Sequence, residues 1–310
     1  MLIGILGGLL TGATWGLSFV APRAIAPVSA FDFSVVRYLL FGLVSLLLMA
    51  APRFRPSGMT TRQLVLGGAL GAFGYFGYFL AISYAVLFAG AVLPPLITGT
   101  APVLLAVVAN LRERTVAWRS IALPLALIVA GLVLVNAHDL RAAAPDEADA
   151  VLAGAALSLL ALGIWILYGL ANAAALRAAA APDALRWTGL QGLGAGAAAV
   201  ALMPFGLDAG LLGHDREVTT RFLAWALGMG VVASWLGTYG WVVASQRLPL
   251  ALSAQLIVAE TVFGLGYGLA FEQRWPSAAE TAGAALQLVG VVAAVAIFSR
   301  RRLTPEPGIP

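Results

Sequence analysis

Hydrophobic residues along this chain are gathered into ten long stretches that are separated by short, more polar loops. The hydrocarbon core of a bilayer is about 30 Å thick, so a helix needs about 20 mostly apolar residues to cross it. The pattern therefore predicts an all-α integral membrane protein with ten transmembrane helices. The first stretch lacks a basic leader, which favours a span over a cleaved signal peptide. The expected spans are 3–21, 33–51, 63–87, 91–110, 117–136, 151–171, 185–204, 219–245, 249–270 and 278–299.

The two halves of the chain end with the same arrangement of an acid and a glycine. Glu113 precedes Gly131 by eighteen residues, and Glu272 precedes Gly290 by the same interval. Each pair closes a block of five expected spans. Because five is odd, consecutive blocks would cross the bilayer in opposite senses, and such inverted repeats are typical of secondary transporters with a midplane substrate site. The expected units are a first five-helix repeat at 1–143, a second, inverted repeat at 144–302 and a disordered cytoplasmic tail at 303–310.

The composition supports a membrane location and gives an orientation. Hydrophobic residues make up 61% of the chain and charged residues 10%, whereas soluble domains have about 45–50% and about 25%. The formal net charge is +4, and the basic residues are all arginines. With the N-terminus inside, they favour the cytoplasmic loops by about two to one, which predicts both termini in the cytoplasm. Topology thus explains the arginines, so we expect a multi-pass protein of the bacterial inner membrane without a nucleic-acid partner.

Polar and aromatic residues follow helical spacing inside several expected spans. Trp15 and Ser18 lie on the polar side of the first span, and Trp165 and Tyr168 form a comparable stripe in the sixth. Unpaired polar groups are costly in hydrocarbon, so such stripes face protein or a water-filled cavity. Lining of a cavity and packing between helices are both open interpretations. The candidate substrate-binding residues are Trp15, Ser18, Tyr78, Thr98, Trp165, Tyr168, Tyr239, Trp241 and Glu260.

Glu260 is the one acid expected in the middle of a span. A charged side chain at the centre of a membrane helix costs about 2.5–3.5 kcal/mol on insertion scales, so it should face protein or water. Desolvation favours the neutral form of a carboxyl group. Three roles are open for it: coupling of transport to protons, pairing with a substrate ammonium group, or a structural hydrogen bond to a neighbouring helix.

The sequence gives little support for an intramembrane enzyme. There is no cysteine, and the two histidines, His138 and His214, fall in expected external loops. An intramembrane enzyme needs a nucleophile with its base, or a set of metal ligands, within the membrane. No second acid or lysine accompanies Glu260 there, so we expect neither a catalytic site nor a metal or other cofactor. A passive channel remains a second alternative to a transporter.

Glycines recur every four residues in the first span, at Gly4, Gly8, Gly12 and Gly16. Helices in lipid associate through close packing of small residues. The spacing therefore predicts that another helix lies against this face, either in a static contact or in one that slides during transport.

The stretches "TAPVLLAVVANLRER" and "AETVFGLGYGLAFEQ" resemble the drug/metabolite transporter superfamily in its ten-helix, EamA-type form. Members typically have a proline within the fourth helix of each repeat, an acid at its end and a glycine in the fifth helix. Pro102 matches in the first half, whereas Thr261 replaces the proline in the second. The resemblance covers nearly the whole chain. It implies the inverted five-plus-five fold.

Within that superfamily, the chain resembles bacterial exporters of aromatic and other neutral amino acids. Its expected interior is rich in Trp and Tyr and sparsely charged, which suits an apolar side chain. Nucleotide sugars would need basic residues inside the membrane, where only Arg37 approaches such a place, with Asp32 nearby. We therefore expect export of an amino acid by alternating access, in a monomer or weak homodimer surrounded by lipid. The alternative is a broad-specificity metabolite or drug exporter.

Overall fold

The computed structural model describes residues 2–101, 103–104, 107–108, 111, 117–142, 148–205, 213–248 and 250–301. Within these residues the chain is helical and forms no β-strand. Pro102 and Glu113 of the first repeat motif and the expected tail at 303–310 lie outside the described residues.

The first half of the chain begins with a broken helix. The expected first span is formed by α1 and a short 3-10 turn, η1, near its end, and α2 follows directly. Where described, the later helices begin and end close to the predicted spans, with two exceptions. The helix Leu93–Thr98 ends in the middle of the expected span 91–110, and the helix Trp118–Ala142 continues past the expected end at 136. The elements are α1 Leu2–Gly16, η1 Leu17–Phe19, α2 Ala21–Ala24, α3 Ala30–Leu48, η2 Pro52–Phe54, α4 Thr61–Ala69, η3 Leu70–Gly77, α5 Tyr78–Ala89, α6 Leu93–Thr98 and α8 Trp118–Ala142.

The second half of the chain has longer uninterrupted helices. The helix α9 alone extends over 29 residues. The elements are α9 Ala148–Leu176, α10 Ala184–Leu202, η4 Met203–Phe205, α11 Arg216–Leu227, η5 Gly228–Leu236, α12 Gly237–Arg247, α13 Leu250–Phe271 and α14 Ala278–Arg301.

Polar residues fix where several of these helices begin. The Ser29 side chain accepts a hydrogen bond from the Asp32 backbone N–H at the start of α3. Thr60 and Gln63 form a capping box at the start of α4. At the start of α10, the Asp183 side chain accepts hydrogen bonds from the backbone N–H groups of Leu185 and Arg186. Such caps satisfy backbone donors that have no partner within the helix.

Two π-helical segments interrupt long helices at related places. The segment η3 joins α4 to α5, and η5 joins α11 to α12, so that 61–89 and 216–247 are each one continuous helix. The two segments begin 158 residues apart and end 159 apart. An interval of 159 residues also separates Gly131 from Gly290. A π-turn widens the helix locally and is frequent at functional sites.

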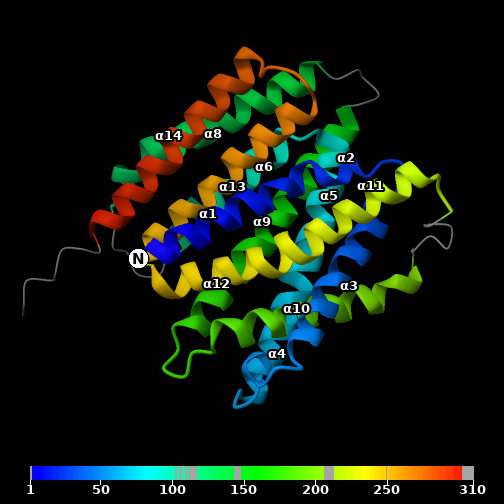
Figure 1. The fold of residues 1–310 in the computed structure, drawn as a ribbon. Coiled ribbons are helices and arrows are strands. Elements are labelled where there is room, and N and C mark those ends of the chain that lie inside the picture. Colours follow the sequence, from blue (N-terminus) through cyan, green and yellow to red (C-terminus); the bar gives the residue numbers. More distant parts are fainter. Residues whose placement is uncertain are drawn as a thin grey trace, which may run out of the picture.

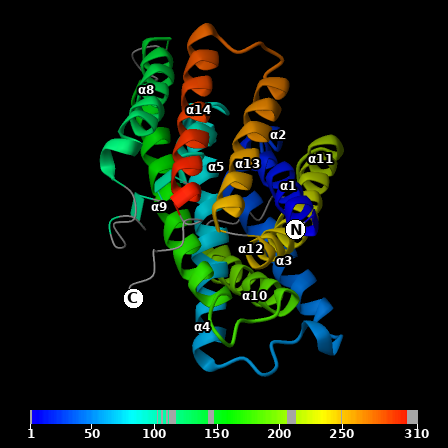
Figure 2. The same ribbon diagram turned by 90° about the vertical axis from the view of Figure 1, so that its left-hand side faces the viewer.

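Glycines allow the closest helix contacts. The helix α1 packs along α12 and α13, and a Cβ atom at Gly16 would lie 2.9 Å from the backbone nitrogen of Gly264. The helices α8 and α14 run side by side along one edge of the molecule (Figures 1 and 2). There a Cβ atom at Gly131 would lie 2.5 Å from the carbonyl oxygen of Gly283. A Cβ atom at Gly290 would lie 2.7 Å from the carbonyl oxygen of Pro124. These contacts leave no room for a side chain.

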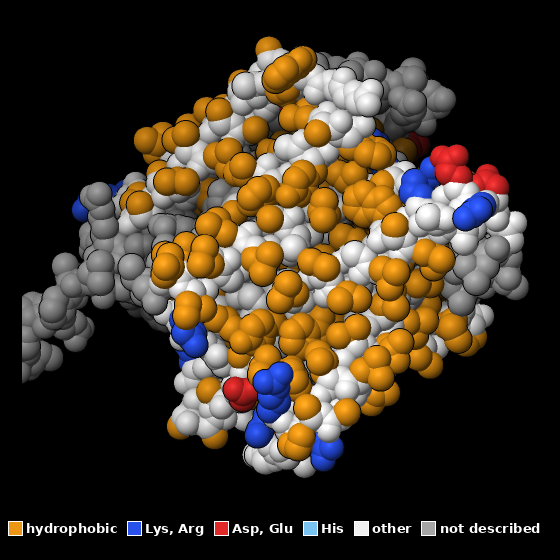
Figure 3. Space-filling view, in the orientation of Figure 1, with side chains coloured by type: hydrophobic (Ala, Val, Ile, Leu, Met, Phe, Trp, Pro, Cys, Tyr) orange, Lys and Arg blue, Asp and Glu red, His pale blue; other side chains and the backbone are white. Residues whose placement is uncertain are grey.

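The surface of the described helices suits a bilayer. Six of them are long and apolar enough to cross a membrane. Hydrophobic side chains cover most of the face in Figure 3, and charged side chains gather at its opposite ends. Large exposed side chains such as Leu43, Leu167 and Val65 lie on this outer surface rather than in the core. An all-helical membrane protein is therefore confirmed. The count of ten spans and the orientation of the termini stay predictions.

Candidate substrate-binding site

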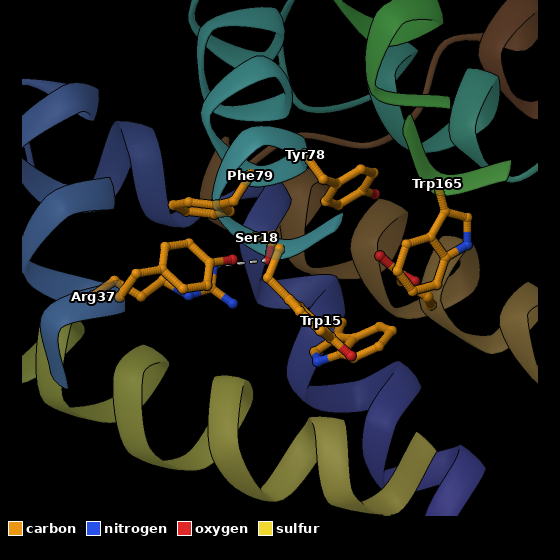
Figure 4. Close-up of a pocket in the computed structure, with 9 residues that line it drawn as sticks. Trp15, Ser18, Arg37, Tyr78, Phe79 and Trp165 are labelled. Atoms are coloured by element: carbon orange, nitrogen blue, oxygen red, sulfur yellow. Dashed lines mark hydrogen bonds between the residues drawn. The ribbon is translucent and has the colours of Figure 1, made fainter. Parts of the chain in front are cut away.

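A small cavity lies where helices from both ends of the chain meet. Its volume is about 20 Å³, which is room for about one water molecule. Its walls come from α1, η1, α3, η3, α5, α9 and α13, and Figure 4 shows six of the side chains directed toward one space. We call it the central cavity. The lining residues are Trp15, Ser18, Arg37, Tyr38, Tyr75, Tyr78, Phe79, Trp165 and Glu260.

Aromatic rings make up most of the cavity wall. The Trp15 ring lies edge-on to Trp165, with 5.3 Å between the centroids, and to Tyr75, with 6.0 Å. The Tyr78 ring lies 5.5 Å from that of Trp165. Edge-to-face and stacked rings at these separations attract one another beyond simple burial. The Trp15 indole also donates a 2.9 Å hydrogen bond to the Ala233 carbonyl, which fixes the ring.

Arg37 reaches the same cavity from α3 and is 3% exposed. Its Nε donates a 2.9 Å hydrogen bond to the Ser234 hydroxyl, and its Nη1 lies 3.4 Å from the Ser18 hydroxyl. Its guanidinium lies over the Phe79 ring, 4.0 Å from the centroid. The group is therefore held by neutral hydroxyls and an aromatic face.

Glu260 reaches the cavity from α13, which belongs to the opposite half of the chain. The Glu260 carboxylate and the Arg37 guanidinium are close enough to interact electrostatically. Neither takes part in an ion pair within the part of the chain that the structure describes. An arginine and a glutamate thus line one small cavity without forming a direct ion pair.

The structure brings five of the nine predicted residues into the cavity wall. The other four lie around it or away from it. Those in the wall are Trp15, Ser18, Tyr78, Trp165 and Glu260.

Tyr168 and Trp241 form a layer behind the wall. The Tyr168 ring stacks on Trp165, with 4.8 Å between centroids, and its hydroxyl lies 2.7 Å from that of Tyr75. Trp241 contacts both Trp15 and Trp165. Its indole nitrogen is buried without a hydrogen-bond partner among the described residues. Both residues therefore support the rings that line the cavity.

Thr98 and Tyr239 are placed differently. The Thr98 hydroxyl donates to the Pro94 carbonyl within α6, at 2.9 Å, and its side chain lies beside Tyr78. The Tyr239 ring stacks on Trp235, with 5.8 Å between centroids, outside the cavity wall. Of the two, only Thr98 adjoins the candidate site.

Four lining residues, Arg37, Tyr38, Tyr75 and Phe79, were not among the predicted binding residues. Arg37 lies deeper inside an expected span than any other arginine, which is the signal that could have found it. The third expected span also carries an unusual density of aromatic residues around Tyr75 and Phe79. Nothing in the helical pattern separates Tyr38 from ordinary core residues.

A second group of arginines and glutamates lies at one end of the bundle, where α2 meets the loop between α13 and α14. Arg23 Nη1 and Arg274 Nε each lie 2.7 Å from an oxygen of Glu272. Arg274 also donates two 2.7 Å hydrogen bonds to Glu280. The hydrogen bonds to Glu280 and Glu272 raise the pKa of Arg274 above its usual value. We call these four residues the rim cluster.

Three comparisons with known proteins agree with this architecture. The sequence model of the EamA-like transporter family matches residues 2–137. Inner membrane protein YtfF of Escherichia coli (strain K12) is 32% identical over 324 residues, which cover 98% of each chain. A solved crystal structure of a protein with 20% identity matches 97% of this chain and 99% of its own, with a TM-score of 0.64. At that identity the last match bears on the fold alone.

The apolar helices and the full-length likeness to an inner membrane protein define a multi-pass protein of the inner membrane. The chain belongs to the EamA-like transporter family of the drug/metabolite transporter superfamily, which confirms the expected family.

Proposed function

We propose that this protein exports aromatic and other neutral amino acids across the inner membrane by alternating access. The observation that carries the proposal is the central cavity, where aromatic rings surround one arginine and one glutamate. Ligand sites are typically apolar and aromatic, with a few well-placed polar groups that orient the ligand. An amino acid with an apolar side chain and a charged backbone end has the matching chemistry.

The size of the cavity supports a mechanism with moving parts. A volume of about 20 Å³ is far below the roughly 300–1,000 Å³ of sites that hold small molecules. We infer that the structure represents a closed state and that helices separate to admit substrate. The two repeats would rock about the cavity, with both termini in the cytoplasm and the rim cluster outside.

Glu260 is the residue that we propose for coupling to protons. It is the acid in the cavity wall, and it is 9% exposed. A carboxylate in such a place can bind either a proton or the ammonium group of a substrate. Exchange of one for the other would link export to the proton gradient.

Transport by purified protein in liposomes tests the proposal. We expect labelled phenylalanine, tyrosine, tryptophan, threonine or methionine to cross the membrane faster than in protein-free liposomes. Failure to move any of them would contradict the proposed function. Equal competition by unrelated drugs and metabolites would favour a broad-specificity exporter, and single-channel currents would indicate a passive channel.

The proposed orientation has its own test. The sequence contains no cysteine, so single cysteines can be introduced at Arg53 and at Arg274. A membrane-impermeant maleimide added outside whole spheroplasts should label the second site and spare the first. The reverse labelling would contradict an inside N-terminus.

A further inference from the structure

We infer that Arg37 binds the carboxylate of the substrate, so that the central cavity accepts zwitterions in preference to amines or acids. The inference rests on the proposed function and narrows it to a substrate class. Arg37 would take the carboxylate from one side of the cavity, and Glu260 would take the ammonium group from the other.

The way in which Arg37 is held leaves it suited to this task. Ser18 precedes α2 in the first half of the chain, and Ser234 lies within η5 in the second. Their hydroxyls contact Nη1 and Nε of Arg37. The guanidinium also lies over the rings of Phe79 and Tyr38, at 4.0 and 5.1 Å from the centroids. These contacts orient the plane of the guanidinium but do not neutralise its charge.

A buried charge without a close counter-ion is costly. Desolvation of one ion in a protein interior costs several kcal/mol, and nearby opposite charge offsets the cost only with good geometry. Arg37 is 3% exposed and forms no ion pair with a described residue. A bound carboxylate would supply the missing anion. Guanidinium groups suit that ligand because their donors match both oxygens at once.

The cavity that contains Arg37 also contains an acid. Glu260 lines the same cavity from α13, and its charge is the one that a substrate ammonium group requires. The rings of Trp15, Tyr78 and Trp165 lie around the same space and can pack against an apolar side chain. A neutral amino acid carries all three features on one small molecule, whereas a monoamine or a monoacid lacks one of them.

Three ligands with the same aromatic side chain test the inference. Phenylalanine has both charges, phenylalanine amide lacks the carboxylate, and 3-phenylpropionate lacks the ammonium group. Each would compete with uptake of labelled phenylalanine into liposomes that hold the wild-type protein. We expect the amide and the acid to compete more weakly by about tenfold or more, the loss typical of a missing charged hydrogen bond.

Variants then assign each preference to one residue. In Arg37→Gln, the amide should compete as well as phenylalanine, while the acid stays weak. In Glu260→Gln, the acid should gain relative to phenylalanine, while the amide stays weak. Arg37→Lys keeps the charge but loses the planar fork, so we expect an intermediate preference. Arg53→Gln, which removes an arginine outside the cavity, is the matched control and should behave as wild type.

The outcomes separate this inference from the proposed function. If phenylalanine and its amide compete equally well for uptake by the wild-type protein, the proposed function stands and the role of Arg37 is overturned. If the wild-type protein moves no amino acid, both are overturned. If Arg37→Gln fails to fold, the ligand series on the wild-type protein and on Arg37→Lys still decides the question.

Discussion

The central cavity and the rim cluster both combine arginine with glutamate, but under opposite conditions. In the rim cluster, each glutamate lies within 2.7 Å of an arginine, and Arg274 is 41% exposed. In the central cavity, Arg37 and Glu260 are buried, and neither forms an ion pair with a described residue. Buried charges that are paired at close range with good geometry cost less than buried charges that are not, and such pairs hold elements together. The contrast supports a structural role for the rim cluster and the substrate-binding role that we propose for the central cavity.

The largest effect should follow from forcing α1 away from α13 beside the cavity. A Cβ atom at Gly12 would lie 3.0 Å from the backbone nitrogen of Glu260. We expect Gly12→Leu to destabilise the fold by about 3 kcal/mol, the upper end for overpacking. The measurement is the melting temperature and monodisperse fraction of the purified protein in detergent.

Gly163→Leu is the control for this change, because a Cβ atom at Gly163 meets nothing within 4 Å. It should fold normally. If Gly12→Leu also folds normally but does not transport, the contact is one that slides during transport and not a static one.

The next largest effect is expected from replacing the acid of the central cavity, Glu260. Glu260→Gln keeps the size of the side chain, so we expect its melting temperature to stay near that of wild type. Uptake of labelled phenylalanine into liposomes should fall by about tenfold to a hundredfold, because a charged hydrogen bond to the substrate is lost. Uptake should also stop responding to an imposed proton gradient.

Glu280→Gln removes a glutamate of the rim cluster and serves as the matched variant. It should keep its response to the gradient. A full response in Glu260→Gln would contradict both the coupling role and the contrast between the two clusters.

A smaller effect, on the KM for phenylalanine, should distinguish Tyr168, which lies behind the cavity wall, from Tyr239, which lies further away. Tyr168→Phe removes the hydroxyl that lies 2.7 Å from the Tyr75 hydroxyl. The loss of one hydrogen bond is worth about 1 kcal/mol, so we expect the KM for phenylalanine to rise several-fold. Tyr239→Phe should leave KM unchanged, since Tyr239 stacks on Trp235 outside the cavity wall. Equal KM values for the two variants would contradict this arrangement.

The smallest effect is expected in the rim cluster. Glu280→Gln should lower stability by about 1 kcal/mol, because Arg274 is partly exposed and its pairs are screened by water. Near 1 M salt the Debye length shrinks to about 3 Å, so the stability difference from wild type should diminish. Glu217→Gln, whose carboxylate is 89% exposed and 3.7 Å from Arg221, should change nothing. A salt-independent loss in Glu280→Gln would assign the rim cluster a different role.

The sequence predicts the helices well because hydropathy alone determines which segments enter a bilayer. The ranges of α3, α9 and α10 lie within a few residues of the expected spans. The break after Gly16 and the short α2 were not predicted. The helix α8 extends to Ala142, beyond the expected end at 136, because polar residues can continue a helix past the apolar core.

The cavity could be predicted only in part. Trp15, Trp165 and Glu260 stand out because large polar groups in mid-span must face protein or water. Tyr239 was expected to line the cavity because it lies near the middle of its span, but depth in the membrane does not determine which side of a helix faces the cavity, and its ring stacks on Trp235 outside the wall.

Arg37 shows a second limit. Its sequence position marked it as unusual, yet its role depends on which other side chains reach the same space. The proximity of Glu260, more than two hundred residues away, and of Ser234 comes from tertiary packing. Likewise, Arg23 and Arg274 were counted only as loop charges, and their joint contact with Glu272 is visible only in the fold.

Uptake of labelled phenylalanine into liposomes that hold wild type, Arg37→Gln or Arg274→Gln tests the central claim most directly. All three proteins should be reconstituted in equal folded amounts. We predict uptake by wild type and by Arg274→Gln, and a fall of about tenfold or more in Arg37→Gln. Equal uptake by all three proteins, or no uptake by wild type, would contradict the assignment of the central cavity as an amino-acid site.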